Sequence, residues 1–149
     1  QKNNIVETYH KALKPIQHLI QQKNIHHSEI DLLNQKEYGY DEARMIQVFQ
    51  NILGNAYKFT DESGMIQTKF IEKDGQLNIS IFNTGKKIPE EDIELIFDKF
   101  YQSKNQNIRK PIGTGLGLAI CKKIIEAHKG EISAENKEIG VVFNIKLNS

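Results

Sequence analysis

The strongest constraint on the fold is a pair of strand-like segments joined by a two-residue turn. Residues 65–72 and 76–83 alternate polar and apolar side chains, which is the pattern of strands with one buried face. Between them lies Asp74-Gly75, a dipeptide favoured in tight hairpins because both positions of that turn require positive φ. The sequence therefore predicts two antiparallel strands that pack on a core.

Helical patterns flank this hairpin on both sides. Asp41 is expected to cap an amphipathic helix that reaches about Thr60. Its apolar positions are Met45, Phe49, Ile52, Leu53 and Ala56. Residues 5–22 also have helical spacing, and Pro15 is expected to kink or divide that helix. A third helix pattern ends at Gly130, and the stretch that begins at Pro89 is typical of a short acidic helix.

Further short strands complete the order of elements. Strand character is found at residues 29–33, 36–40, 131–135 and 140–147. This order predicts an α+β fold, a two-layer α/β sandwich in which helices cover one face of a mixed, mostly antiparallel sheet. The chain has 149 residues, 38% of them apolar, so we expect one domain spanning residues 1–149.

Composition argues against several classes of partner. The formal net charge is +1, so no global field attracts polyanions, and we expect neither nucleic acid nor membrane contact. No stretch approaches the roughly 20 apolar residues of a membrane span, and the polar first residues do not resemble a signal peptide. A cytoplasmic location is therefore expected. Cys121 falls on the apolar side of the last helix and is expected to be a buried structural thiol.

Alternate glycines at Gly113, Gly115 and Gly117 open the last helix pattern. Glycines let backbone approach a ligand closely, and the amides at a helix start favour an anion such as phosphate. The surrounding segment is basic, with Lys99, Lys104, Arg109, Lys110, Lys122 and Lys123. By itself the pattern also suits a flexible loop with solvated charges. It has neither the lysine and hydroxyl pair of a P-loop nor the parallel unit of a dinucleotide-binding fold.

The helix expected after Asp41 carries a polar strip that borders its apolar face. Asn51, Asn55 and Lys58 share this strip at the helical repeat. An amide oxygen can bind magnesium beside phosphate oxygens, and a lysine can contact phosphate as a point charge. The alternative is an ordinary polar surface whose hydrogen bonds are satisfied. A nucleotide triphosphate would use both chemistries.

These residues carry a resemblance to the sensor histidine kinases. Residues 51–60, which begin Asn51-Ile-Leu-Gly-Asn55, resemble the N box of that family. Residues 83–89 resemble the first glycine box, residues 96–101 the F box, and residues 113–118 the second glycine box, in the family's order. The resemblance covers about residues 5–147 and implies the GHKL, or Bergerat, ATP-binding fold, in agreement with the pattern of elements.

The resemblance implies a role for each matching position. Asn55 would coordinate magnesium, and Asn51, Asn55 and Lys58 would form the catalytic centre. The ATP-binding residues would be Asn51, Asn55, Lys58, Phe59, Asn83, Gly85, Ile88, Phe100, Arg109, Lys110, Gly113, Thr114, Gly115, Leu116, Gly117 and Leu118. Residues 102–112 would form the ATP lid, and Phe97 and Phe100 would anchor it, although core packing explains both phenylalanines equally well. The implied cofactors are ATP and Mg²⁺.

Two positions depart from the family pattern. Asn83 replaces an aspartate that accepts a hydrogen bond from adenine; its carbonyl keeps one acceptor without the charge. Lys87 stands where a glycine is expected, and lysine disfavours positive φ, so this loop is expected to follow another path or to form a less complete pocket. Both departures leave open a nucleotide-binding or scaffold module with weakened catalysis.

The expected acceptor of the phosphoryl group lies on another domain. His10 and Pro15 have the spacing of the family's phosphoacceptor motif, but Lys11 and Lys14 replace its acid and its hydroxyl or amide residue. The expected activity is therefore a protein-histidine kinase that phosphorylates a dimerisation domain of the same parent protein and acts indirectly on a response regulator. The isolated domain is expected to be a monomer, and the parent protein is a candidate for membrane anchoring. A GHKL-type ATPase is the other enzyme considered, but Asn51 stands where those ATPases place a glutamate.

Overall fold

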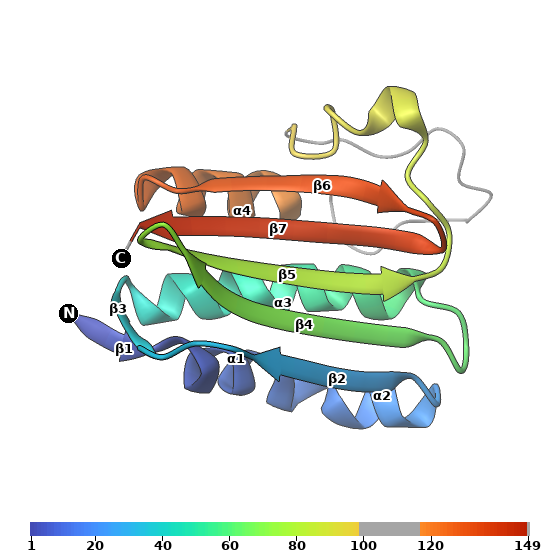
Figure 1. The fold of residues 1–149 in the computed structure, drawn as a ribbon. Helices are drawn as coiled ribbons and strands as arrows, with labels where there is room; N and C mark the ends of the chain where they lie inside the picture. Colours follow the sequence, from blue (N-terminus) through green and yellow to red (C-terminus); the bar gives the residue numbers. More distant parts are fainter. Residues whose placement is uncertain (99–116, 149) are drawn as a thin grey trace.

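The computed structural model describes residues 1–98 and 117–148. Its main sheet has five strands in the order β2-β4-β5-β7-β6. These strands are β2 (His26–Asp31), β4 (Met65–Lys73), β5 (Gln76–Thr84), β6 (Glu131–Lys137) and β7 (Gly140–Asn148). Figure 1 shows one face of the sheet covered by the helices α1 (Ile5–Leu13), α2 (Gln17–Gln22), α3 (Glu42–Phe59) and α4 (Gly117–Ala127). The predicted α+β sandwich is confirmed.

The β4–β5 hairpin has the predicted register and turn. Lys73 pairs with Gln76 across the turn, and Asp74 and Gly75 have φ of 54° and 78°. β5 pairs antiparallel with β7, and β7 with β6, whereas β2 lies parallel to β4. The sheet is therefore mixed and mostly antiparallel, as expected.

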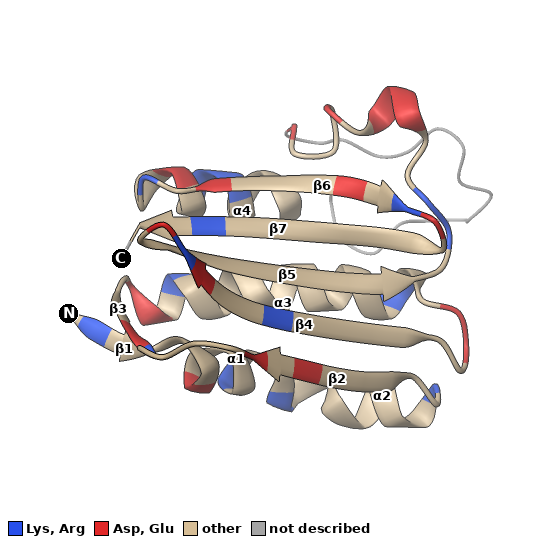
Figure 2. Cartoon of the chain, viewed as in Figure 1, with Lys and Arg blue, Asp and Glu red and all other residues tan. Residues whose placement is uncertain are grey.

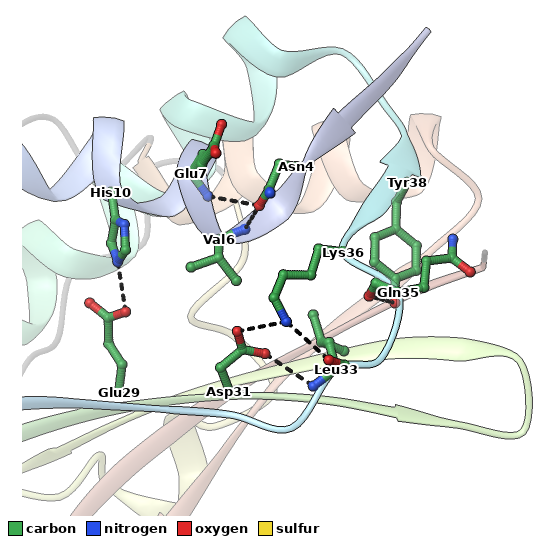
Figure 3. A network of polar contacts seen from close by, with 10 residues as sticks. All are labelled: Asn4, Val6, Glu7, His10, Glu29, Asp31, Leu33, Gln35, Lys36 and Tyr38. Atoms are coloured by element: carbon green, nitrogen blue, oxygen red, sulfur yellow. Dashed lines mark hydrogen bonds and ion pairs between the residues drawn. The ribbon is translucent and has the colours of Figure 1, made fainter.

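β2 begins three residues before the predicted strand at residues 29–33 and ends at Asp31. The difference arises because the positions of β2 that face the helices are polar. His27 pairs with Ile66 and receives a contact from the Tyr9 hydroxyl at 3.0 Å, and Glu29 lies 2.7 Å from Nε2 of His10 (Figure 3). An apolar pattern could not reveal a strand whose inner face binds α1 through polar groups.

The strand predicted at residues 36–40 exists but lies outside the main sheet. It is β3 (Glu37–Gly39), which pairs antiparallel with β1 (Lys2–Asn4) in a separate two-stranded sheet. β1 was not predicted because its residues are polar. The Asn4 side chain then caps α1 by accepting hydrogen bonds from the amides of Val6 and Glu7 (Figure 3).

The core lies between the sheet and the helical layer. All five apolar positions predicted on α3 are buried, and Val48 joins them. The Tyr9 ring meets the rings of Phe49 and Phe70 edge-on, with centroids 5.4 and 5.5 Å apart. Cys121 is fully buried, as expected, and burial raises the pKa of its thiol to about 12.

Other element boundaries follow from local backbone chemistry. Pro15 divides the first helix as predicted, through a 3-10 turn at Lys14–Ile16 between α1 and α2. The acidic helix predicted from Pro89 is only a 3-10 turn, Glu90–Asp92. β6 extends to Lys137, two residues beyond the predicted end. None of the helices in residues 1–98 and 117–148 combines the length and apolar character needed to cross a membrane.

Candidate functional site

The polar strip of α3 lies where that helix faces the start of α4. Asp41 caps α3, since its side chain accepts a hydrogen bond from the amide of Arg44 at 3.2 Å. Ten residues after Asp41, the Asn51 amide donates a hydrogen bond to the carbonyl of Gly117 at 3.1 Å. Asn51 therefore connects the N box to the second glycine box, which the sequence placed sixty-six positions later.

Asn55 and Lys58 continue this strip toward the C-terminal end of α3. Both side chains are half-buried. Within the described part of the chain, the Asn55 amide has no hydrogen-bond partner and the Lys58 ammonium has no carboxylate partner. Lys58 Nζ lies 5.0 Å from the centre of the Phe59 ring, and burial lowers the pKa of Lys58. The strip thus offers an amide and a partly desolvated cation to a ligand.

The end of β5 adjoins the end of α3. Gly85 has φ of 133°, and a Cβ at this position would collide with the carbonyl oxygen of Phe59. Two residues earlier, Asn83 is 4% exposed, and its Nδ2 donates a hydrogen bond to the carbonyl of Thr84 at 3.0 Å. Close contact between the backbones of Gly85 and Phe59 therefore brings the N box and the first glycine box together. The Nδ2 group of Asn83 already donates a hydrogen bond within the protein.

The loop after Gly85 is held by a residue that sequence reasoning missed. Asn136 of β6 accepts a hydrogen bond from the Ile88 amide at 2.9 Å and donates one to the Ile88 carbonyl at 2.7 Å. Nothing in the sequence marked Asn136, because it lies 48 residues away from its partner. Lys87 does not adopt positive φ. The loop therefore holds lysine at this position without the strain of a positive φ.

A second missed residue is Gly140, at the start of β7. A Cβ at this position would overlap the backbone carbonyl of Asn83 on the paired strand. Only a glycine permits β7 to approach β5 this closely beside the candidate site. The sequence showed a glycine at a strand end but could not show which backbone it meets.

The described part of the F box packs into the core. Ile96 is 4% exposed, and the Phe97 ring meets Phe143 edge-on with centroids 6.1 Å apart. Leu118, like Ile88, is partly buried against the core. The predicted site residues Phe100, Arg109, Lys110, Gly113, Thr114, Gly115 and Leu116, and the lid at residues 102–112, lie outside the described residues.

The described part of the site combines basic side chains with the amide side chains of asparagines. Figure 2 shows basic residues near the C-terminal end of α3 and on the chain that leaves β5, whereas acidic residues gather on the 3-10 turn that follows. Phe59, Asn83 and Gly85 thus lie at one end of the site and Asn51 and Gly117 at the other, with Asn55 and Lys58 on the helix between them. This arrangement can hold an anion together with a hard cation.

A family model and two sensor proteins match this chain. The model is described as "Histidine kinase-, DNA gyrase B-, and HSP90-like ATPase" and matches residues 40–149. The Sensor protein VanSC of Enterococcus gallinarum is 33% identical over 129 residues, which are 87% of this chain and 35% of that protein. The Sensor histidine kinase WalK of Bacillus subtilis is 40% identical over 100 residues, 66% of this chain and 16% of that protein. The chain thus spans about a third or less of these relatives.

A solved structure matches nearly the whole chain. The catalytic domain of histidine kinase ThkA superposes with a TM-score of 0.88 and is 33% identical, covering 99% of this chain and 96% of that one. A structure of ThkA in complex with response regulator protein TrrA also matches, with a TM-score of 0.84, 31% identity, and coverage of 99% of this chain and 41% of that one.

Proposed function

This chain belongs to the family of histidine kinase-, DNA gyrase B- and HSP90-like ATPases, and from that premise we propose that it is the ATP-binding catalytic domain of a sensor histidine kinase. The proposed reaction transfers the γ-phosphoryl group of ATP to a histidine on a separate domain of the same parent protein. A response regulator then receives the phosphoryl group. The similarity to named sensor histidine kinases and to the ThkA catalytic domain supports this reaction.

The single observation that carries the proposal is the pair of available polar groups on α3. Asn55 and Lys58 are half-buried, and neither has a polar partner among the described residues that would explain it as a structural group. Both groups keep some contact with solvent, so they are available to a ligand, and partial removal from water strengthens a contact with a charged one. A metal-bound triphosphate supplies oxygen atoms to the metal and negative charge to the lysine.

Magnesium fits the donor set at this position. Mg²⁺ prefers oxygen ligands and usually combines one or two protein ligands with phosphate oxygens and water. The Asn55 amide oxygen is such a ligand. When bound, the ion would neutralise charge on the phosphoryl group during transfer. Lys58 would contact phosphate, and its lowered pKa reflects partial removal from water, which strengthens attraction to an anion.

The adenine side of the site would be formed by the end of β5. Asn83 Nδ2 donates a hydrogen bond to the carbonyl of Thr84. The side-chain Oδ1 of Asn83 is then the group left to accept a hydrogen bond from an adenine amino group. Gly85 and Ile88 would line the loop beside the base. Residues 113–118, with Arg109 and Lys110, would bind the phosphates as the family's second glycine box and lid do.

Asn51 favours transfer to a histidine over hydrolysis. Water must be activated by a base for rapid hydrolysis, and an amide cannot accept the proton. Asn51 instead donates its amide hydrogen to Gly117, so its clearest role is to hold the start of α4 against α3. An ATPase is therefore the weaker candidate, and a nucleotide-binding scaffold is the alternative that the departures at Asn83 and Lys87 keep open.

The partners proposed are a histidine-bearing dimerisation domain of the parent protein and, beyond it, a response regulator. The isolated chain is proposed to be monomeric, because dimerisation would belong to the domain that carries the histidine. A cytoplasmic position for this domain, in a parent protein that a membrane anchors, would suit that arrangement. The ThkA complex with TrrA shows that a similar protein binds a response regulator.

Calorimetric titration of the chain with ATP tests the binding site. The wild type should bind more tightly with magnesium than without it, whereas Asn55→Ala should lose at least about tenfold of the magnesium-dependent gain. Gln50→Ala, an exposed position on the same helix, is the matched control and should bind like the wild type. A wild-type chain that ignores ATP, or an Asn55→Ala variant with the full magnesium response, would contradict the proposal.

Labelled ATP then identifies the activity. The chain is incubated with magnesium and the acceptor domain of its parent protein. Label on the acceptor histidine supports the kinase. Release of free phosphate without labelled acceptor supports an ATPase, and bound ATP that is not consumed supports a scaffold.

A further inference from the structure

We propose that Asn136 is a positioning residue for the nucleotide base: it holds the loop at residues 85–88 against the sheet, beside Asn83. The inference rests on the proposed function and adds a residue that lies outside the motifs recognised in the sequence. Asn136 belongs to β6, at the edge of the sheet, and acts on the site only through the loop.

The contact engages both backbone groups of one residue. Asn136 Oδ1 accepts from the Ile88 amide at 2.9 Å, and Nδ2 donates to the Ile88 carbonyl at 2.7 Å. The same Nδ2 donates to Oε2 of Glu90 at 3.1 Å. Half-buried backbone groups need partners, and Ile88 lies in a loop with no strand to supply them. The Asn136 side chain supplies the donor and the acceptor that a neighbouring strand would otherwise provide to Ile88.

The other end of the loop is held by the same hairpin. The Gly85 amide donates to the carbonyl of Ile139 at 3.0 Å, in the turn between β6 and β7. Asn136 pairs with Val141 near that turn. Figure 1 shows the chain leaving the end of β5 and passing the adjacent ends of β7 and β6. One hairpin therefore fixes both ends of the segment that begins two residues after Asn83.

The uncharged amide of Asn136 satisfies both Ile88 groups, one through its oxygen and the other through its nitrogen. Alanine offers neither a donor nor an acceptor. Aspartate keeps the acceptor for the Ile88 amide, but when ionised it cannot donate to the Ile88 carbonyl and it faces the Glu90 carboxylate. Protonated aspartate regains a donor. A carboxyl ionises at about pH 4, so at neutral pH an aspartate at position 136 should leave the Ile88 carbonyl without its donor.

Release of the loop should weaken binding of the base without affecting the metal. If the loop holds its binding position for only a fraction of the time, the apparent Kd rises by the inverse of that fraction. The loss should be equal for ATP and ADP, which share the base. The ratio of ATP affinities with and without magnesium should stay unchanged, because it depends on α3.

Calorimetry with ATP and ADP, with and without magnesium, tests this role in the 149-residue chain. Asn136→Ala should bind both nucleotides about tenfold more weakly, with the magnesium ratio of the wild type. Asn136→Asp, which is ionised at about pH 7.5 and so cannot donate to the Ile88 carbonyl, should also lose affinity for both nucleotides, with the magnesium ratio of the wild type. Asn144→Ala, an asparagine on the neighbouring strand β7, is the matched control and should bind normally.

The outcomes separate the two proposals. Wild-type affinity in Asn136→Ala, or a loss confined to the magnesium response, overturns the role of Asn136 and leaves the kinase proposal intact. A wild-type chain that binds no nucleotide overturns both. If Asn136→Ala does not fold, Asn136→Asp decides, since it keeps the size of the side chain: wild-type affinity of this variant at about pH 7.5 refutes the inference.

Discussion

Gly85→Ala should be far more destabilising than an ordinary glycine substitution in this protein. Gly85 has φ of 133°, a conformation that L side chains rarely adopt, and its Cβ would collide with the backbone carbonyl of Phe59. The carbonyl belongs to the last residue of α3 and cannot rotate away as a flexible side chain would. The end of β5 must therefore move away from the helix that carries Asn55 and Lys58.

The magnitude follows from these two effects. A side chain held in a sparsely populated backbone region costs about 1 to 3 kcal/mol. Overpacking against a rigid group adds about 1 to 3 kcal/mol, and the smaller conformational entropy of the unfolded alanine chain returns about 0.4 to 1 kcal/mol. The free energy of unfolding should therefore fall by about 3 kcal/mol, which lowers the Tm by roughly 6 to 12 °C in a chain of this size.

Two other glycines separate the contributions in a urea titration followed by circular dichroism. Gly75 has φ of 78° with no atom within 4 Å of an added Cβ, so Gly75→Ala isolates the backbone term and should cost about 1 kcal/mol. Gly54, inside α3, has ordinary φ and the same open space, so Gly54→Ala should stabilise the protein by about 1 kcal/mol. If Gly85→Ala costs no more than Gly75→Ala, the contact with Phe59 is refuted.

Two further predictions concern the polar groups between α1 and the sheet. Tyr9→Phe should lower the free energy of unfolding by about 2 kcal/mol, because the buried Thr68 hydroxyl loses a partner 2.5 Å away. Adding Thr68→Val should recover part of that loss in a urea titration, and strictly additive losses would contradict the contact. The pKa of His27 lies below its ordinary value of 6.5, mainly because the side chain is partly buried. The nearby His10 and His26 lower this pKa further, whereas Glu29 opposes the shift. Since the unfolded chain then binds the proton more readily, this contribution to stability is complete above about pH 6.5 and is lost as the pH falls through the folded pKa. His27→Gln should therefore flatten the fall in unfolding free energy below about pH 6.5, and an unchanged slope would show that His27 does not cause it.

The elements that the sequence identified are those whose information is local. The Asp74-Gly75 turn, the cap at Asp41 and the apolar spacing of α3 depend on residues within a few positions of each other. The motifs that contain Asn51, Asn55, Lys58 and Asn83 are local in the same sense, since each is a short run of residues. Whether those positions bind ATP remains a prediction, because their roles came from a resemblance.

Apart from β1 and the short turn after Pro89, the sequence by itself therefore determined the order of elements, together with the sandwich class and the family, since backbone propensity, side-chain period and motif spacing all depend on neighbouring residues. Tertiary structure alone decided which distant residues meet: the Asn51 amide with Gly117, Gly85 with the Phe59 carbonyl, and Asn136 with Ile88. It also decided that β2 is a strand with a polar inner face, because His27 and Glu29 find partners on α1. The physical reason is that a hydrogen bond or a close backbone approach between distant segments depends on how the packed layers place them, and no local pattern records that placement.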